Sequence, residues 1–435
     1  MLLGVAAIAG LGVGPRMHEL PQAPAQTGHA PPASRGAPIT CDSLAWRSPD
    51  TLRMPDGRPV FVQSPNAIVA VRTGLALIGF PAYAWVTPRS FGDARRLPEN
   101  LGAGIVIQRN GRVVPVPFPS GVRLMVDPLV VQGDSGTAHV MWGEPIAGMS
   151  PPYLRVGSLW YARFDGSDWT APEQVFRASE IRWNAVFAPA AALGDDVFVA
   201  APGFDSTRQW VGIVSLALAH GHWNATRIPI LHYPNYLALA AVAPRNVLIA
   251  FPGIDDSTRG GGGSSHRVLF ALQSADAGAT WSRPRRLVAL SEGDGYSPQA
   301  VVTSDGITHL VWSSKLFVDV APVIRSLVTR DWQQWNSGTI INLKGPLSEF
   351  ASIEGAGGRV HIVARSARTG RLASTVITRT AVMPMSTMDV PPASATLSLS
   401  RVGRDSLVLA WGIGFAAGSA GFTALATLAT TCEHR

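Results

Sequence analysis

The sequence predicts an all-β protein, a β-propeller of four-stranded antiparallel blades, with seven blades favoured and six as the alternative. Trp169, Trp223, Trp281 and Trp335 each enter a short polar or extended segment, and they lie 54, 58 and 54 residues apart. A tight turn followed by an apolar strand recurs seven times. A period near fifty is typical of propeller blades, since one four-stranded sheet cannot bury both faces until its neighbours stack on it. The seven turn-and-strand units are Thr73–Pro81, Ser135–Trp142, Asp195–Pro202, Arg245–Pro252, Asp305–Trp312, Gly357–Ala364 and Arg404–Trp411.

Ring closure gives an independent reason for this architecture. The segment from Ala45 to Leu52 matches the run Trp-Ser-Arg-Pro-Arg-Arg-Leu that begins at Trp281. It therefore resembles an outer strand detached from its own repeat. Residues 422–430 resemble a third strand that ends where a fourth should begin. We expect the N-terminal strand to complete the last blade.

Cys41 and Cys432 are the only two cysteines, and they flank this junction. A bridge between them would close a loop of almost the whole domain and stabilise it by about 4–5 kcal/mol in the chain-entropy model. The alternative is a pair of unrelated buried thiols. The placement favours the disulfide, and with it an oxidising compartment.

Composition agrees with a single large β-domain. The chain has 435 residues, of which 46% are hydrophobic and 15% charged, with 44 Gly and 34 Pro for many turns. The net charge of +7 comes mostly from dispersed arginines, without the basic run or interleaved aromatics of nucleic-acid grooves. No nucleic-acid partner is expected, whereas anionic glycans or a cell envelope remain suitable partners.

Residues 1–38 form a separate N-terminal segment. Leu2–Gly14 is a short apolar run without a preceding basic region, and a Pro/Ala/Gly-rich stretch follows it. This pattern is typical of a signal peptide and a disordered linker. We expect a secreted or periplasmic protein with the propeller at residues 39–435.

The C-terminal segment allows two interpretations. Residues 407–430 carry no charge and are long enough to cross a bilayer, so a membrane-anchored scaffold subunit is one alternative. Against it, Leu407–Trp411 matches the other blade strands, and Gly418–Gly421 interrupts the run where an inter-strand loop should fall. Strands are favoured over a membrane helix.

One stretch links the chain to a known family. The residues Ser274, Asp276, Gly278, Thr280 and Trp281 fit the pattern S-x-D-x-G-x-T-W. The pattern resembles the Asp-box of sialidase-like (BNR-repeat) β-propellers. The resemblance implies a hairpin between the third and fourth strands of a blade, in which Asp caps backbone N–H groups and Gly takes a positive φ. It implies a structural role before any activity.

Sialidase chemistry is only partly represented. Members of the family clamp the substrate carboxylate with three Arg and use a Tyr–Glu nucleophile pair with an Asp acid/base. Arg53, in Leu52-Arg-Met-Pro55, is the nearest match to the first Arg. The last tyrosine is Tyr296, whereas the family's nucleophile comes from a late blade. No Asp or Glu lies between Arg58 and Gly92, where the acid/base is expected. Catalytic residues therefore stay unassigned apart from the candidate Arg53.

A non-catalytic module that binds a glycan, another ligand or a cell-envelope protein is the favoured function. A sialidase-type exo-glycosidase is the first alternative and the scaffold subunit the second. No cofactor and no metal is expected, and His139, His309 and His361, at equivalent strand starts, are interpreted as structural. Ligands of propellers usually meet the rim formed by the second-to-third and inter-blade loops. The predicted rim comprises Glu144, Arg182, Trp183, Asp205, Arg208, Tyr233, Tyr236, Asp255, Arg259 and Tyr296.

Overall fold

The fold is known from a computed structural model of the chain. The structure describes residues 37–38, 45–46, 50–53, 60–61, 68–72, 74–81, 104–109, 112–122, 125–133, 136–145, 156–177, 181, 183, 188–204, 210–230, 236–243, 245–254, 267–288, 296–314, 323–343, 347–388, 390, 397–402, 406–413 and 422–429.

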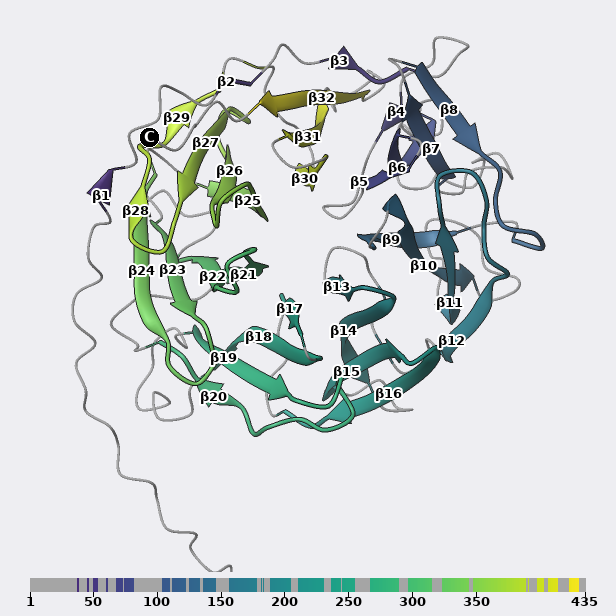
Figure 1. Ribbon diagram of the computed structural model, residues 1–435, viewed down its shortest axis with the longest axis horizontal. Coiled ribbons are helices and arrows are strands. Elements are labelled where there is room, and N and C mark those ends of the chain that lie inside the picture. Colours follow the sequence, from purple (N-terminus) through teal and green to yellow (C-terminus); the bar gives the residue numbers. More distant parts are fainter. Residues whose placement is uncertain are drawn as a thin grey trace, which may run out of the picture.

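The described strands form seven sheets around a central axis (Figure 1), which is the architecture of a β-propeller. Their mutual pairing is antiparallel apart from that of the short strand β1. Sheet 1 contains β4 (Val60–Phe61), β5 (Ile68–Val71), β6 (Gly74–Pro81), β7 (Gly104–Arg109) and β8 (Arg112–Val116). Sheet 2 contains β9 (Val126–Gln132), β10 (Ala138–Pro145), β11 (Val156–Phe164) and β12 (Glu173–Arg177). Sheet 3 contains β13 (Ala190–Leu193), β14 (Asp196–Phe204), β15 (Trp210–Ala219) and β16 (His222–Ile228).

The next two sheets repeat the same order of strands from the axis outward. Sheet 4 contains β17 (Ala238–Val242), β18 (Asn246–Ile254), β19 (Arg267–Ser274) and β20 (Arg285–Arg286). Sheet 5 contains β21 (Tyr296–Val302), β22 (Thr308–Ser313), β23 (Val323–Thr329) and β24 (Asn336–Asn342).

The last two sheets take strands from both ends of the chain. Sheet 6 contains β25 (Leu347–Glu354), β26 (Val360–Ser366), β27 (Leu372–Ile377), β28 (Ala381–Val382) and β29 (Ser386–Thr387), and β1 (Ala37–Pro38) pairs with β28 in parallel. Sheet 7 contains β30 (Leu397–Arg401), β31 (Ser406–Ile413) and β32 (Phe422–Ala429). β2 (Ala45–Trp46) and β3 (Asp50–Thr51) pair with β32. The expected pairing of the N-terminal strand with the last strand, β32, is therefore present. The first strand, β1, lies at the end of the segment 1–38 that was expected to be a linker.

Neighbouring sheets share their cores around the whole circuit. The innermost strands β5, β9, β13, β17, β21, β25 and β30 contact one another in turn, and β30 contacts β5. One cluster joins Val408 of sheet 7, Val69 of sheet 1 and Val140 of sheet 2. The middle of the second strand is mostly apolar because a neighbouring sheet covers each of its faces. Val197 to Ala201 of β14, for example, are all buried.

The recurring tryptophans occupy matching places. Trp169, Trp223, Trp281 and Trp335 lie in the connection between the third and fourth strands of sheets 2 to 5, or at the start of the fourth strand. Each packs into the cluster shared with the preceding sheet. Trp46 does the same between sheets 7 and 6. The predicted repeat is therefore a repeat of packing positions.

The segment 407–430 supplies two strands of sheet 7. β31 and β32 pair over eight residues, from Ser406 with Ala429 to Ile413 with Phe422. The alternative of a membrane-spanning helix here is wrong, because the backbone groups are satisfied by an antiparallel ladder. Among the described residues, no helix is long and apolar enough to cross a membrane.

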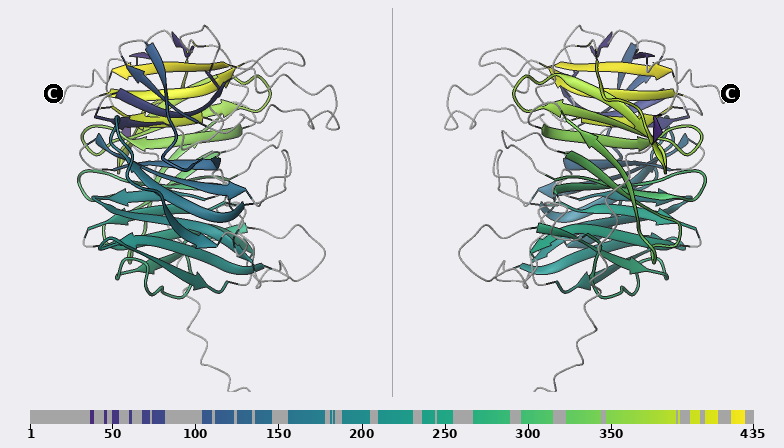
Figure 2. Two further views of the ribbon diagram at one scale, coloured as in Figure 1. Left: turned by 90° about the vertical axis from the view of Figure 1, so that its right-hand side faces the viewer. Right: turned by 90° about the vertical axis from the view of Figure 1, so that its left-hand side faces the viewer.

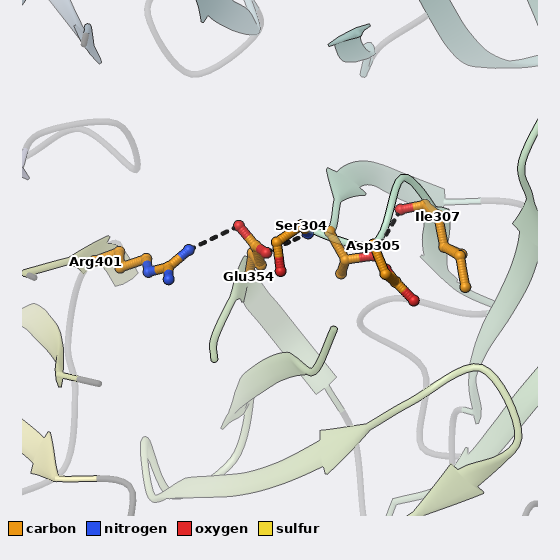
Figure 3. Close-up of polar contacts among 6 residues, drawn as sticks. Ser304, Asp305, Ile307, Glu354 and Arg401 are labelled. Atoms are coloured by element: carbon orange, nitrogen blue, oxygen red, sulfur yellow. Dashed lines mark hydrogen bonds and ion pairs between the residues drawn. The ribbon is translucent and has the colours of Figure 1, made fainter. Parts of the chain in front are cut away.

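The sheets run between two faces of the ring (Figure 2). We call the end where second strands stop and third strands start the loop face. The opposite end, with the first-to-second and third-to-fourth turns, is the hairpin face. On the hairpin face Glu354 links three sheets, accepting from Arg401 Nη1 at 2.9 Å and from the backbone N–H of Ser304 (Figure 3).

Candidate functional site

The described part of the predicted rim lies on the loop face. Glu144 is exposed near the end of β10 and accepts a hydrogen bond from Trp160 Nε1 on β11 at 2.8 Å. The bond holds a carboxylate and an indole together at the end of sheet 2. Trp160 was missed from the sequence because it is the cross-strand register, Trp142 opposite Trp160, that brings it beside Glu144.

A second pair joins two sheets at the same face. Tyr296 begins β21, and the guanidinium of Arg267, which begins β19, lies 5.7 Å from the centre of its ring. This is the distance of a cation–π contact. Both side chains are half-buried, so a flat aromatic and a five-donor cation sit together where two neighbouring sheets meet. Sequence inspection found Tyr296 but missed Arg267, whose only signal is its position directly before an apolar strand.

A third pair is more enclosed. Arg365 Nη2 on β26 contacts Glu349 Oε2 on β25 at 3.2 Å, and the Leu397 backbone donates to Glu349 Oε1 at 3.1 Å. Burial raises the pKa of Glu349, while the charge of Arg365 and the Leu397 N–H oppose the rise. Both carboxylate oxygens are engaged, so Glu349 ties sheets 6 and 7 together beside the axis.

The remaining rim residues divide into two groups. Trp183 is only 7% exposed and packs with Ile181 and Leu216 between sheets 2 and 3, so it belongs to the core and is not an open binding surface. Tyr236 is half-buried shortly before β17. The other predicted members lie outside the described residues: Arg182, Asp205, Arg208, Tyr233, Asp255 and Arg259. Cys41 and Cys432 lie outside them as well.

Arg53 is placed far from the centre of the ring. It follows β3, which pairs with β32 on the side away from β31, at the outer edge of sheet 7. The side chain is exposed. A carboxylate clamp near the axis of the ring would need a residue from an inner strand or its loops.

The Asp-box-like loop is held by its own polar groups. The Ser274 hydroxyl donates to Asp276 at 2.8 Å and accepts from the Gly278 N–H at 2.8 Å. Asp276 accepts from the Thr280 hydroxyl and N–H at 2.6 and 2.8 Å, and these bonds lower its pKa. Gly278 has φ +85°. Trp281 Nε1 donates to the Gly278 carbonyl at 3.0 Å. All these bonds are internal, which indicates a structural role.

The equivalent hairpin of sheet 5, between its third and fourth strands, repeats this hydrogen-bonding pattern with different residues. Asp331 accepts from the N–H groups of Gln333 and Gln334, each at 2.9 Å. Trp335 Nε1 donates to the Trp332 carbonyl at 3.1 Å. The loop therefore depends on a carboxylate that caps N–H groups and an indole that caps a carbonyl.

The three equivalent histidines are buried at the starts of second strands. Each follows a turn closed by the same backbone bond, as in Thr303 N to Ile307 O at 2.8 Å. His139 contacts the Tyr161 hydroxyl at 2.7 Å, and burial raises the pKa of Tyr161. Burial lowers the pKa of His309 and of His361 to about 4. Among the described residues, no group of three or more His, Cys, Asp or Glu could hold a metal ion.

Comparisons with known proteins complete this description. Neither a protein-family model nor a curated protein matches the sequence. Solved structures that resemble the chain include a PL25 ulvan lyase, with 10% identity, coverage of 89% of this chain and 96% of that chain, and a TM-score of 0.49. An α-L-arabinanase of Penicillium chrysogenum has 12% identity, coverage of 70% and 93%, and a TM-score of 0.46. A Hadza microbial sialidase has 12% identity, coverage of 75% and 73%, and a TM-score of 0.41. At these values the likenesses carry no argument about function.

Proposed function

We propose that this chain is an exported, non-catalytic β-propeller that binds glycans at its loop face. The observation that carries the proposal is the pairing of Arg267 with Tyr296 across two sheets. A sugar offers hydroxyl groups that accept from a guanidinium and an apolar face that stacks on a flat ring. Glu144 and Trp160 provide the complementary pair, an acceptor beside an aromatic, on sheet 2.

The described side chains favour binding over catalysis. A sialidase-type mechanism needs an activated nucleophile and a proton donor beside the substrate. Tyr161 is buried, and burial raises its pKa, so its phenol stays protonated. Arg53 lies at the outer edge of sheet 7, away from the loop-face pairs. Glu349 has the raised pKa of a proton donor, but both of its oxygens are occupied within the protein.

The architecture that presents this face is proposed as a seven-bladed propeller whose last blade is completed by the N-terminal strand. Its support is the circuit of contacts among the seven inner strands and the pairing of β2 and β3 with β32. A disulfide between Cys41 and Cys432 is part of this proposal. Ala45, four residues after Cys41, pairs with Ala429, three residues before Cys432. Export to an oxidising compartment is consistent with that bridge.

A binding experiment tests the function. The purified full chain is applied to an array of immobilised glycans that includes neutral, uronic-acid and sialic-acid structures, and hits are titrated in solution. We expect saturable binding that Arg267→Ala and Tyr296→Ala each weaken about tenfold, the loss expected for one good polar or stacking contact. Arg283→Ala, an exposed arginine on the hairpin face, is the matched control and should bind normally.

Two results would overturn the proposal. One is the absence of saturable binding to every glycan. The other is turnover of a fluorogenic sialoside that Arg53→Ala abolishes without unfolding the protein, which would establish the enzyme alternative.

A further inference from the structure

The hairpin face carries a second concave site, distant from the loop face. A groove of about 540 Å³ lies where turns of three adjacent sheets meet. Arg72 comes from the turn after β5, Thr137 from the turn before β10, and Asp195 from the turn before β14. The end of β11 and the connection that follows it, together residues 163–170, form the remaining wall. Its size is within the range of small-ligand pockets, roughly 300–1,000 Å³.

One wall of the groove is a fixed aromatic ring. Trp169 Nε1 donates to the Pro117 carbonyl at 2.9 Å. Its ring packs against Phe164 with the centres 4.7 Å apart. The indole is half-buried. Since both contacts lie within the protein, the orientation of the indole needs no ligand to define it.

The polar groups of the groove include unused hydrogen-bonding capacity. Arg163 Nη1 is paired with Asp195 Oδ1 at 2.6 Å, and one oxygen of Asp165 accepts the N–H groups of Ser167 and Asp168 at 2.8 Å. These bonds, together with the nearby charge of Arg72, lower the pKa of Asp165. Within the described part of the chain, the guanidinium of Arg72 and the carboxylate of Asp168 make no hydrogen bond.

The charged side chains of the groove contribute little to the stability of the fold. The Arg163–Asp195 pair is exposed, with 41% and 83% of the side chains accessible. Exposed ion pairs contribute little to stability. Arg72 and Asp168 are exposed as well. Trp169 and Asp165 also serve the fold, but the exposed Arg72 and Asp168 add a donor and an acceptor beside them that the local structure does not use.

From this combination we infer that the groove between sheets 1, 2 and 3 is a binding site for a neutral monosaccharide unit with vicinal hydroxyl groups. Each hydroxyl both donates and accepts, so one can donate to Asp168 while its neighbour accepts from Arg72. The apolar face of the sugar ring lies against Trp169. An anionic ligand fits less well, since the groove has three carboxylates and two guanidinium groups, one of them already paired. This site does not depend on the proposed function of the loop face.

Titration with methyl glycosides tests the inference. Methyl α-D-mannoside, methyl β-D-galactoside and methyl α-L-fucoside are titrated into the intact protein and followed by saturation-transfer NMR, with methyl β-D-glucuronide as the anionic comparison. At least one neutral glycoside should bind saturably and more tightly than the glucuronide. Arg72→Ala and Asp168→Asn should each weaken this binding about tenfold, as expected for one lost hydrogen bond. Both side chains are exposed, so both variants should melt like wild type.

Arg283→Ala serves as the control for removal of an exposed arginine on the hairpin face. Binding that persists unchanged in both Arg72→Ala and Asp168→Asn would overturn the inference. So would a preference for the glucuronide, or the absence of saturable binding to all three neutral glycosides. Binding lost only in Arg267→Ala or Tyr296→Ala would assign the glycoside to the loop face and also refute a site in the groove. Failure of the loop-face proposal would leave these measurements unaffected.

Discussion

Replacing Trp46 with alanine should destabilise the protein by about 3 kcal/mol, because this residue joins the N-terminal strand to the last two sheets. Trp46 lies in the outer strand of sheet 7 and packs among Leu372, Leu397 and Trp411. Its Nε1 donates to Ser374 Oγ on sheet 6 at 3.1 Å. A fully buried Trp→Ala change costs roughly 3–5 kcal/mol. Trp46 is half-buried, so about 2 kcal/mol is expected for packing and about 1 kcal/mol for the hydrogen bond.

Equilibrium unfolding in guanidinium chloride, followed by circular dichroism and by tryptophan fluorescence, measures this change. Trp46→Phe keeps most of the packing and loses the hydrogen bond, so it should cost only about 1 kcal/mol. Ser374→Ala should cost a similar amount, and the double variant should show little further loss, because both single changes remove the same bond. Equal stability of Trp46→Ala, Trp46→Phe and wild type would show that the N-terminal strand is dispensable and would refute the closure argument.

Three further predictions follow from buried, strained and covalent features. For His309 and His361, whose pKa is about 4 in the fold, the unfolded chain binds more protons below pH 6.5. The unfolding free energy should therefore be constant above pH 6.5 and fall towards pH 4, by up to about 3 kcal/mol per histidine. In denaturant titrations at a series of pH values, His309→Gln should reduce the slope of unfolding free energy against pH. Gly212→Ala should cost several kcal/mol of unfolding free energy by the same assay, since φ is +135° and an added Cβ would meet the Ile228 carbonyl. Gly221→Ala, with open space around the added Cβ, should cost about 1 kcal/mol. Equal costs for the two variants would contradict the steric argument. Denatured, unreduced protein from an oxidising host should contain no titratable thiol, and Cys41→Ser with Cys432→Ser should lose about 4–5 kcal/mol; two free thiols in the wild type would disprove the bridge.

The repeat could be predicted because each blade reuses a few positions with demanding chemistry. A Trp after the third strand must fill the gap to the preceding sheet, and the second strand must be apolar on both faces. Trp169 and Trp281 indicate the first requirement in the sequence. The apolar run from Val197 to Ala201 indicates the second. The pairing of β2 with β32 could also be predicted from the sequence, because the segment that matches an outer strand lies at the N-terminal end of the chain while the last repeat lacks one.

Sheet 6 shows where the pattern fails. Its outer edge has no tryptophan and no single fourth strand. The two short strands β28 and β29 both pair with β27, and β1 then extends the edge in parallel. Met383 and Met388 are buried here. Flexible side chains adapt to an irregular gap and leave no period in the sequence.

The residues of the candidate site were harder to predict because they lie in pairs that the strand register creates. Arg267 and Tyr296 come from different sheets, and Trp160 reaches Glu144 only through the ladder between β10 and β11. Trp183 was expected at the rim because it sits in a connection, yet it fills the space between sheets 2 and 3. The groove on the hairpin face is the extreme case, since each of its turns is ordinary in isolation.

The two proposed sites differ in how the ring would use them. They lie on opposite faces of the ring of sheets, so a single short glycan cannot reach both. Linked binding events raise avidity only when the geometry permits simultaneous engagement. One glycan end therefore cannot bind at both sites at once. Two separate glycan chains can be held together, one at Arg267 and Tyr296 and the other at Arg72 and Asp168. Sites arranged in this way would cross-link a polysaccharide layer, and each additional contact would come from a second strand of polymer.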